Sequence, residues 1–162
     1  MNRGRVTSLL AGLVVIATSA WLLWPNTRPM PAVTFNLVDG GRIDSADLRG
    51  RSLLVNFWSV SCTTCLRDMP RLAALQQSLP AEKFSVIGVA MPYDPPPAVM
   101  TTVARLQPTY PIAFDVHGEL SRAFGDIRVT PTSFLIDPSG NIRYAERGQL
   151  DETRVRATLA TF

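Results

Sequence analysis

The stretch Trp58-Ser59-Val60-Ser61-Cys62-Thr63-Thr64-Cys65 holds the only two cysteines of this 162-residue chain. It follows the apolar run 53–57, which is typical of a strand buried on both faces, and it precedes a segment with helical periodicity. A strand that delivers Cys-x-x-Cys to the start of a helix is typical of a thiol–disulfide redox site. Unpaired backbone N–H groups and the helix dipole stabilise negative charge there. Cys62 is therefore expected to ionise readily and to act as the nucleophile.

Three other uses of the cysteine pair stay open. A structural zinc site normally takes four ligands, and His117, expected on the surface, is the only other soft ligand. A purely structural disulfide would close a very short loop, whereas the entropic benefit of a disulfide grows with loop length. Copper(I) also binds thiolates, but no spacing singles out Met69 or Met91 as a further ligand. We therefore expect neither a metal nor a cofactor.

Residues 1–24 are expected to be a membrane anchor. Arg3 and Arg5 precede residues 6–24, a run without charged residues that is long enough to span a bilayer as a helix. The arginines predict that the N-terminus stays in the cytoplasm, so the globular part would lie on the far side of the membrane. A cleaved signal peptide is the alternative, because residues 17–20 are small and suit a cleavage site. Both interpretations export the domain.

The remainder of the chain is expected to be one domain. Residues 25–31 contain three prolines and are interpreted as a linker, and residues 32–162 as the domain. The formal net charge is +3, and no basic run with interleaved aromatic residues is present. Nucleic-acid binding is therefore not expected.

Strands that alternate with helices and end in a hairpin predict an α/β sandwich around one mixed sheet. The expected strands cover residues 32–37, 42–48, 52–58, 84–90, 112–114, 133–136 and 141–146. The expected helices begin after Cys62, cover 98–106 and 118–124, and run from an Asp151 cap toward Leu159. The first helix carries a core-facing stripe of Met69, Leu72, Leu75 and Leu79.

Three motifs resemble the thioredoxin superfamily and occur in its order. They are Phe57-Trp58-x-x-x-Cys62-x-x-Cys65, the helix proline Pro70, and the segment 129–137, which is similar to the segment that holds the family's cis-proline. With the anchor and the N-terminal hairpin, the chain is similar to the TlpA/ResA/CcmG-like membrane-tethered thiol–disulfide oxidoreductases. The resemblance implies a thioredoxin-like three-layer α/β/α sandwich with an N-terminal hairpin and a central strand–helix insertion, preceded by one transmembrane helix.

The resemblance also implies roles for individual residues. Cys62 would attack a substrate disulfide, and Cys65 would then release the reduced substrate. Trp58, Thr130 and Pro131 would bind the substrate. Trp58 would pack beside the site and partly shield it; the alternative for this residue is ordinary core packing. A cis Thr130–Pro131 bond would turn the Thr130 backbone toward the cysteines, where it can pair with an extended peptide, and the alternative is a plain turn before the strand.

The acid–base partner of Cys65 is less directly indicated. Many thioredoxins have a buried Asp where this chain has Asn56, which cannot titrate. In the ResA-like group an acid sits three residues after the second cysteine, and Asp68 holds that position. Its carboxylate could reach toward Cys65 and accept a proton. The alternative is that Asp68 only complements the N-terminus of the helix.

The resemblance implies a reductase of protein disulfides, anchored in the bacterial inner membrane with its catalytic domain in the periplasm. Electrons would come from a membrane thiol transporter of the DsbD/CcdA type. Substrates in the family include the haem-site cysteines of apocytochrome c and oxidised copper-site cysteines. No His lies between the cysteines, which favours a reductase over a DsbA-like oxidase. A disulfide-donating oxidase or isomerase and a non-enzymatic copper(I)-binding or docking module are the alternatives.

Overall fold

The computed structural model describes residues 28–162, so the predicted anchor of residues 1–24 lies outside the described residues. Eight strands form one mixed sheet in the order β1-β8-β7-β4-β5-β6-β2-β3. The strands are β1 (Arg28–Pro29), β2 (Thr34–Leu37), β3 (Arg42–Asp44), β4 (Ser52–Trp58), β5 (Phe84–Ala90), β6 (Ile112–Phe114), β7 (Thr132–Ile136) and β8 (Asn141–Arg147). The β4–β5 and β5–β6 pairs are parallel, and the other pairs are antiparallel.

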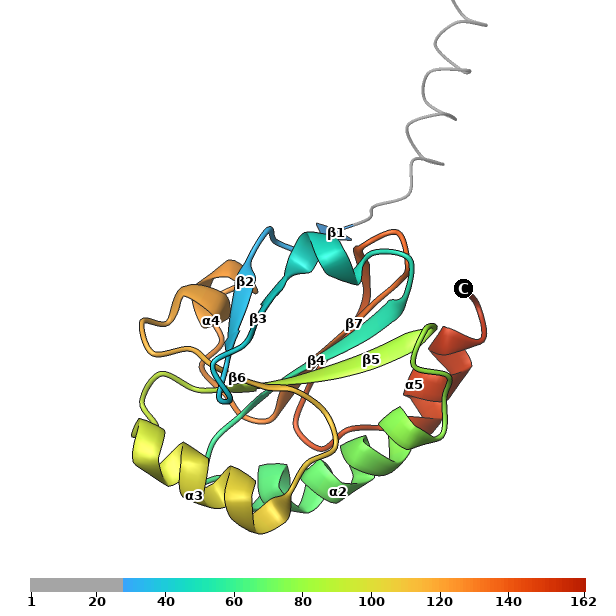
Figure 1. Cartoon of the computed structure of the whole chain (residues 1–162). Coiled ribbons are helices and arrows are strands. Elements are labelled where there is room, and N and C mark those ends of the chain that lie inside the picture. Colours follow the sequence, from blue (N-terminus) through green and yellow to red (C-terminus); the bar gives the residue numbers. More distant parts are fainter. Residues whose placement is uncertain (1–27) are drawn as a thin grey trace, which may run out of the picture.

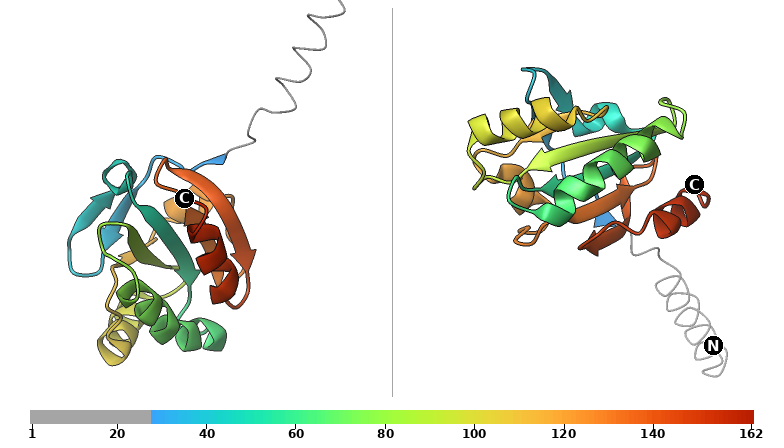
Figure 2. Two further views of the ribbon diagram at one scale, coloured as in Figure 1. Left: turned by 90° about the vertical axis from the view of Figure 1, so that its right-hand side faces the viewer. Right: turned by 90° about the horizontal axis from the view of Figure 1, so that it is seen from below.

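Helices cover both faces of the sheet and complete the predicted three layers (Figures 1 and 2). They are the 3₁₀ helix η1 (Ser45–Leu48) and the α-helices α2 (Thr63–Gln77), α3 (Pro96–Leu106), α4 (Glu119–Ala123) and α5 (Glu152–Leu159). Helices α2, α3 and α5 lie on one face, and η1 and α4 lie on the other.

The sheet divides the apolar core in two, and β4 contributes to both halves. Every residue of β4 is buried, as predicted for its unbroken apolar run. Leu54 and Trp58 pack on the face of α2, whereas Val55 and Phe57 pack on the face of α4, because successive strand side chains point to opposite faces. The predicted stripe on α2 is confirmed for Met69, Leu72 and Leu75, which are buried. Leu79 lies beyond the end of α2 at Gln77 but packs against the same cluster.

The expected strand 42–48 is partly wrong. Strand β3 ends at Asp44, and the following residues form η1. The Ser45 N–H still donates to the Val33 carbonyl at 2.9 Å, as the register of β2 and β3 requires. The Val33 N–H, however, donates to Ser45 Oγ at 3.0 Å, so a side chain takes the place of the backbone acceptor where the strand ends. The turn of η1 then buries Leu48 in the core, where it is 6% exposed.

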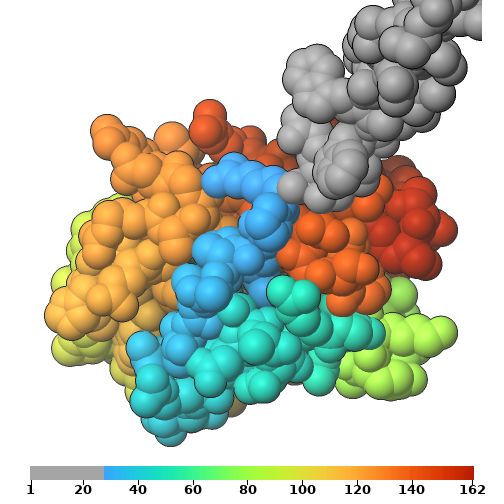
Figure 3. Space-filling view, turned by 90° about the horizontal axis from the view of Figure 1, so that it is seen from above, coloured from blue at the N-terminus to red at the C-terminus, as the bar shows by residue number. Residues whose placement is uncertain are grey.

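The described chain begins near the start of strand β4, whereas the cysteines follow the other end of that strand. Within the expected linker, Arg28 and Pro29 pair with the start of β8, and the Met30 N–H donates to the Gly140 carbonyl at 2.9 Å. Figure 3 shows this first segment lying between α4 and the β7–β8 turn. The Gly50 N–H, just before β4 begins, donates to the Pro138 carbonyl in the β7–β8 turn. The cysteines, by contrast, follow the end of β4. Within residues 28–162, no helix is long and apolar enough to cross a bilayer.

Candidate active site

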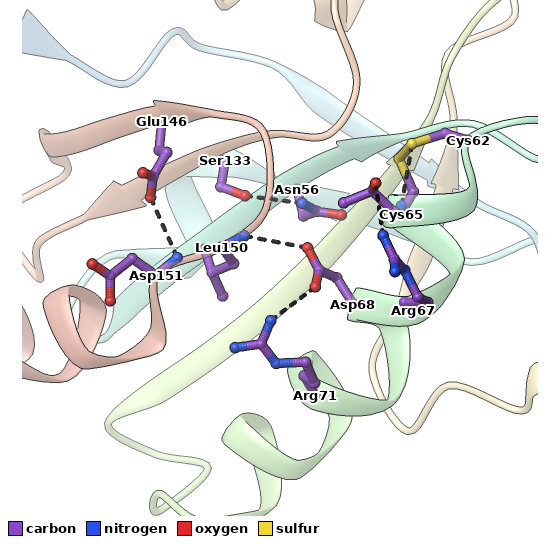
Figure 4. Close-up of polar contacts among 11 residues, drawn as sticks. Asn56, Cys62, Cys65, Arg67, Asp68, Arg71, Ser133, Glu146, Leu150 and Asp151 are labelled. Atoms are coloured by element: carbon purple, nitrogen blue, oxygen red, sulfur yellow. Dashed lines mark hydrogen bonds and ion pairs between the residues drawn. A yellow bond between two sulfur atoms is a disulfide. The ribbon is translucent and has the colours of Figure 1, made fainter.

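Cys62 and Cys65 form a disulfide at the junction of β4 and α2 (Figure 4). Cys62 is the N-cap residue of α2, and its Sγ accepts a hydrogen bond from the backbone N–H of Cys65 at 3.1 Å. Cys65 is 1% exposed, whereas Cys62 is half-buried. A partner therefore reaches Cys62 first. After reduction, the Cys65 N–H and the helix N-terminus would stabilise a thiolate at Cys62.

The segment before β7 lies against the exposed sulfur. The Thr130–Pro131 peptide bond is cis, as predicted. The Thr130 carbonyl oxygen lies 3.6 Å from Cys62 Sγ, although the two residues are 68 positions apart. The Gly148 N–H donates to the Pro131 carbonyl at 2.7 Å and holds the segment to the end of β8. Thr130 is half-buried, so its backbone lies at the surface beside Cys62.

Trp58 does not reach that surface, and the structure corrects its predicted contact with substrate. The side chain is fully buried, and within the described chain its indole N–H has no hydrogen-bond partner. Trp58 shares a face of β4 with Leu54 and therefore points into the core beside α2. It packs with residues of α2 in the core next to the cysteines.

The carboxylate of Asp68 connects α2 to the loop before α5 (Figure 4). Asp68 is 1% exposed; its Oδ1 accepts from Arg71 at 3.0 Å, and its Oδ2 accepts from the Leu150 N–H at 3.2 Å. The role of Asp68 as proton acceptor for Cys65 stays a prediction. No acid lies in the first turn of α2, and Asp68 follows in the second turn, so the alternative role at the helix N-terminus also stays a prediction.

A second titratable group lies near this carboxylate. Burial raises the pKa of the Tyr110 hydroxyl, and the negative charge of Asp68 raises it further. Tyr110 is 4% exposed and packs in the core on the face of α2. It is therefore a neutral phenol at physiological pH.

Asn56 occupies the interior of β4 and is 3% exposed. Its Nδ2 donates to Ser133 Oγ on β7 at 2.9 Å, so the amide bridges two neighbouring strands of the sheet. This position holds no ionisable group, as its sequence predicted.

Asp94 is a site residue that the sequence reasoning missed. It lies in the loop between β5 and α3, and its carboxylate bonds Ser59 and Val60, directly before the cysteine motif. The sequence did contain a signal. Strands β4 and β5 are parallel neighbours, and residues that follow the carboxyl ends of such strands gather at one edge of a sheet.

A disulfide at a helix N-terminus, faced by a cis-proline on an α/β/α sandwich, defines a thioredoxin-like protein. Residues 25–161 match the family described as Redoxin, and the chain belongs to that family, among the TlpA/ResA/CcmG-like members of the thioredoxin superfamily.

Known relatives agree with this assignment. The chain is 32% identical over 126 residues to the thiol-disulfide oxidoreductase ResA of Halalkalibacterium halodurans, covering 76% of this chain and 70% of that protein. It is 31% identical over 149 residues to protein DipZ of Mycobacterium tuberculosis, covering 87% of this chain. The chain spans only 19% of the length of DipZ. A solved thiol:disulfide interchange protein of Chlorobium tepidum is 30% identical, with a TM-score of 0.74 over 83% of this chain and 97% of that one.

Proposed function

We propose that this protein is a thiol–disulfide oxidoreductase that reduces disulfides in other proteins through Cys62 and Cys65. The observation that carries the proposal is the position of Cys62: half-buried, at the N-terminus of α2, with the Thr130 carbonyl 3.6 Å from its sulfur. Relatives named thiol-disulfide oxidoreductase support the same chemistry.

The cycle starts from the reduced dithiol. The Cys62 thiolate attacks one sulfur of the substrate disulfide, forms a mixed disulfide and releases the other substrate sulfur as a thiolate. Cys65, after losing its proton, attacks Cys62 Sγ and releases the second substrate thiolate. Two electrons have then passed to the substrate, whose thiolates take up protons from water, and the Cys62–Cys65 disulfide remains. The residues beside Thr130 would hold the substrate segment as an added strand.

A further dithiol must reduce the protein again. We propose a membrane thiol transporter of the DsbD/CcdA type as this donor, and the haem-site cysteines of apocytochrome c or oxidised copper-site cysteines as substrates. Family resemblance supports both, and the absence of His between the cysteines supports the reducing direction.

We place the domain in the bacterial periplasm, held to the inner membrane by residues 6–24, with residues 25–31 leading to the domain at 32–162. The uncharged run after Arg3 and Arg5 supports the anchor. The described chain begins at the end of the sheet away from the cysteines. An anchor that precedes β1 would therefore leave the disulfide facing away from the bilayer.

Replacing Cys65 by Ser tests the dithiol chemistry against the non-enzymatic alternatives. Without the second cysteine, a reductase or an oxidase traps its partner on Cys62 as a covalent mixed disulfide. The matched control is Cys62→Ser, which leaves only the buried thiol of Cys65 and should trap little. A binding or copper(I)-docking module would instead keep its partner complex in both variants and show no adduct that a reductant removes.

A further inference from the structure

One buried carboxylate holds the turn that leads into Cys62. Asp94 is 7% exposed; its Oδ1 accepts from Ser59 Oγ and its Oδ2 accepts from the Val60 N–H, each at 2.9 Å. Across residues 28–162, no basic side chain forms an ion pair with this carboxylate. Both of its oxygens are therefore used on the turn itself.

The carboxylate of Asp94 can only accept hydrogen bonds, and this determines which hydroxyl donates in the contacts of Ser59 and Ser61. Ser59 has one hydroxyl hydrogen, which it donates to the carboxylate, so at the 3.0 Å contact between Ser59 and Ser61 the hydroxyl of Ser61 is the donor. The Ser61 N–H also donates to Ser59 Oγ, at 3.3 Å. The Ser59 carbonyl then accepts from the Cys62 N–H at 3.2 Å. Hydrogen bonds thus connect residues 59–62, directly or through Ser59, to the carboxylate of Asp94 in another loop.

We propose that Asp94 is a positioning residue for the dithiol: it fixes the turn 59–61 so that Cys62 Sγ stays within bonding reach of Cys65. The inference rests on the proposed function. The stability of an intramolecular disulfide depends on the effective concentration of one thiol at the other, and a fixed geometry raises that concentration. A loosened turn would lower it, so the disulfide would be reduced more easily and the reduction potential would be less negative.

Charge alone would shift the potential in the same direction. Removing a buried negative charge near Cys62 favours the thiolate, and therefore the reduced form. A substitution of Ser59 distinguishes the effect of position from the effect of charge. Ser59→Ala keeps the charged carboxylate of Asp94 and removes the hydroxyl that links it to Ser61. Positioning predicts a shift in Asp94→Asn and in Ser59→Ala, whereas charge alone predicts a shift only in Asp94→Asn.

A matched control is available on the neighbouring loop. Asp115 is 4% exposed, and its two oxygens accept from the N–H groups of Leu120 and Ser121 at 2.9 Å each. It thus fixes the start of α4 in the way that Asp94 fixes the active-site turn. Asp115→Asn makes the same chemical change without a bond to the residues that lead into Cys62.

The test is the equilibrium of the protein with reduced and oxidised glutathione. The reaction is stopped by alkylation of free thiols, and the reduced and oxidised forms are quantified by mass spectrometry. The protein disulfide and two glutathione thiols give the dithiol and one glutathione disulfide. We expect Asp94→Asn to favour the dithiol by about tenfold, which corresponds to a potential about 30 mV less negative. Ser59→Ala should shift the equilibrium by about threefold, and Asp115→Asn by less than about twofold.

Two results would overturn the positioning role. One is an equilibrium constant for Ser59→Ala within about twofold of that of the parent protein. This result would overturn the role whether or not Asp94→Asn changes the constant, and even if Asp94→Asn does not fold. The other is an equal shift in Asp115→Asn, which would show a general loss of rigidity. A parent chain that equilibrates with glutathione but does not reduce protein disulfides would refute the proposed function and leave this comparison intact.

Discussion

Replacing Asp68 by Ala should destabilise the protein, because this carboxylate joins the active-site helix to the loop before α5. The Leu150 N–H, inside the protein, would lose its acceptor, and an unsatisfied buried donor costs about 1–3 kcal/mol. The ion pair with Arg71 adds at most about 1 kcal/mol, because the arginine side chain is 41% exposed and solvent screens it. Removing a buried carboxylate recovers part of its desolvation energy. The expected loss in free energy of unfolding is about 2 kcal/mol.

Urea unfolding of the oxidised protein measures this loss as a lower midpoint with an unchanged slope. Asp68→Asn is the matched variant: its amide oxygen can still accept from Leu150, so it should cost about half as much. A loss below about 0.5 kcal/mol in Asp68→Ala would refute the connecting role. If Asp68→Asn kept full stability but slowed the release of reduced substrate near neutral pH, the predicted proton-acceptor role would explain Asp68 better.

Three further substitutions test other parts of the fold. Leu72→Ala removes a fully buried side chain from α2 and should cost about 2–5 kcal/mol in urea unfolding; a cost below 1 kcal/mol, roughly, would contradict the packing of α2 on the sheet. Asp151→Ala removes the N-cap of α5, whose carboxylate accepts from the Arg154 N–H at 3.0 Å, and should cost about 1 kcal/mol; Asp151→Asn should retain most of that. The raised pKa of Tyr110 gives stability that is complete below about pH 10 and is lost as the pH rises further, so Tyr110→Phe should flatten the alkaline fall in the free energy of unfolding; an unchanged alkaline slope would contradict this.

Much of the site was predictable because its signals are local. The buried run of β4, the cysteine spacing and the stripe on α2 lie in one continuous stretch, and strand and helix periodicity place them correctly. Asp151 was also found locally, as a cap one residue before α5. The cis bond at Pro131 came from the family resemblance, since the residue itself carries no signal for it.

The parts that sequence reasoning missed depend on contacts between distant segments. Asp94 reaches Ser59 across 35 positions, and the signal for this contact lies in the parallel pairing of β4 with β5 rather than in the Asp94 loop itself. Strand β3 ends where the Val33 N–H donates to the side chain of Ser45, a contact that the pattern of residues 42–48 does not indicate. The substrate role of Trp58 came from the family resemblance, but strand alternation turns the side chain into the core, which was the alternative interpretation of this residue.

The reduction potential of the Cys62–Cys65 pair tests the central claim most directly. The protein would be equilibrated against glutathione or a stronger dithiol buffer, and because the chain has only two cysteines, alkylation of both reports the reduced fraction without ambiguity. A reductase supplied by a membrane donor should have a potential near or below that of thioredoxin, about −270 mV. A potential near that of the strong oxidant DsbA, about −120 mV, would contradict the reductase assignment and make disulfide donation the better account.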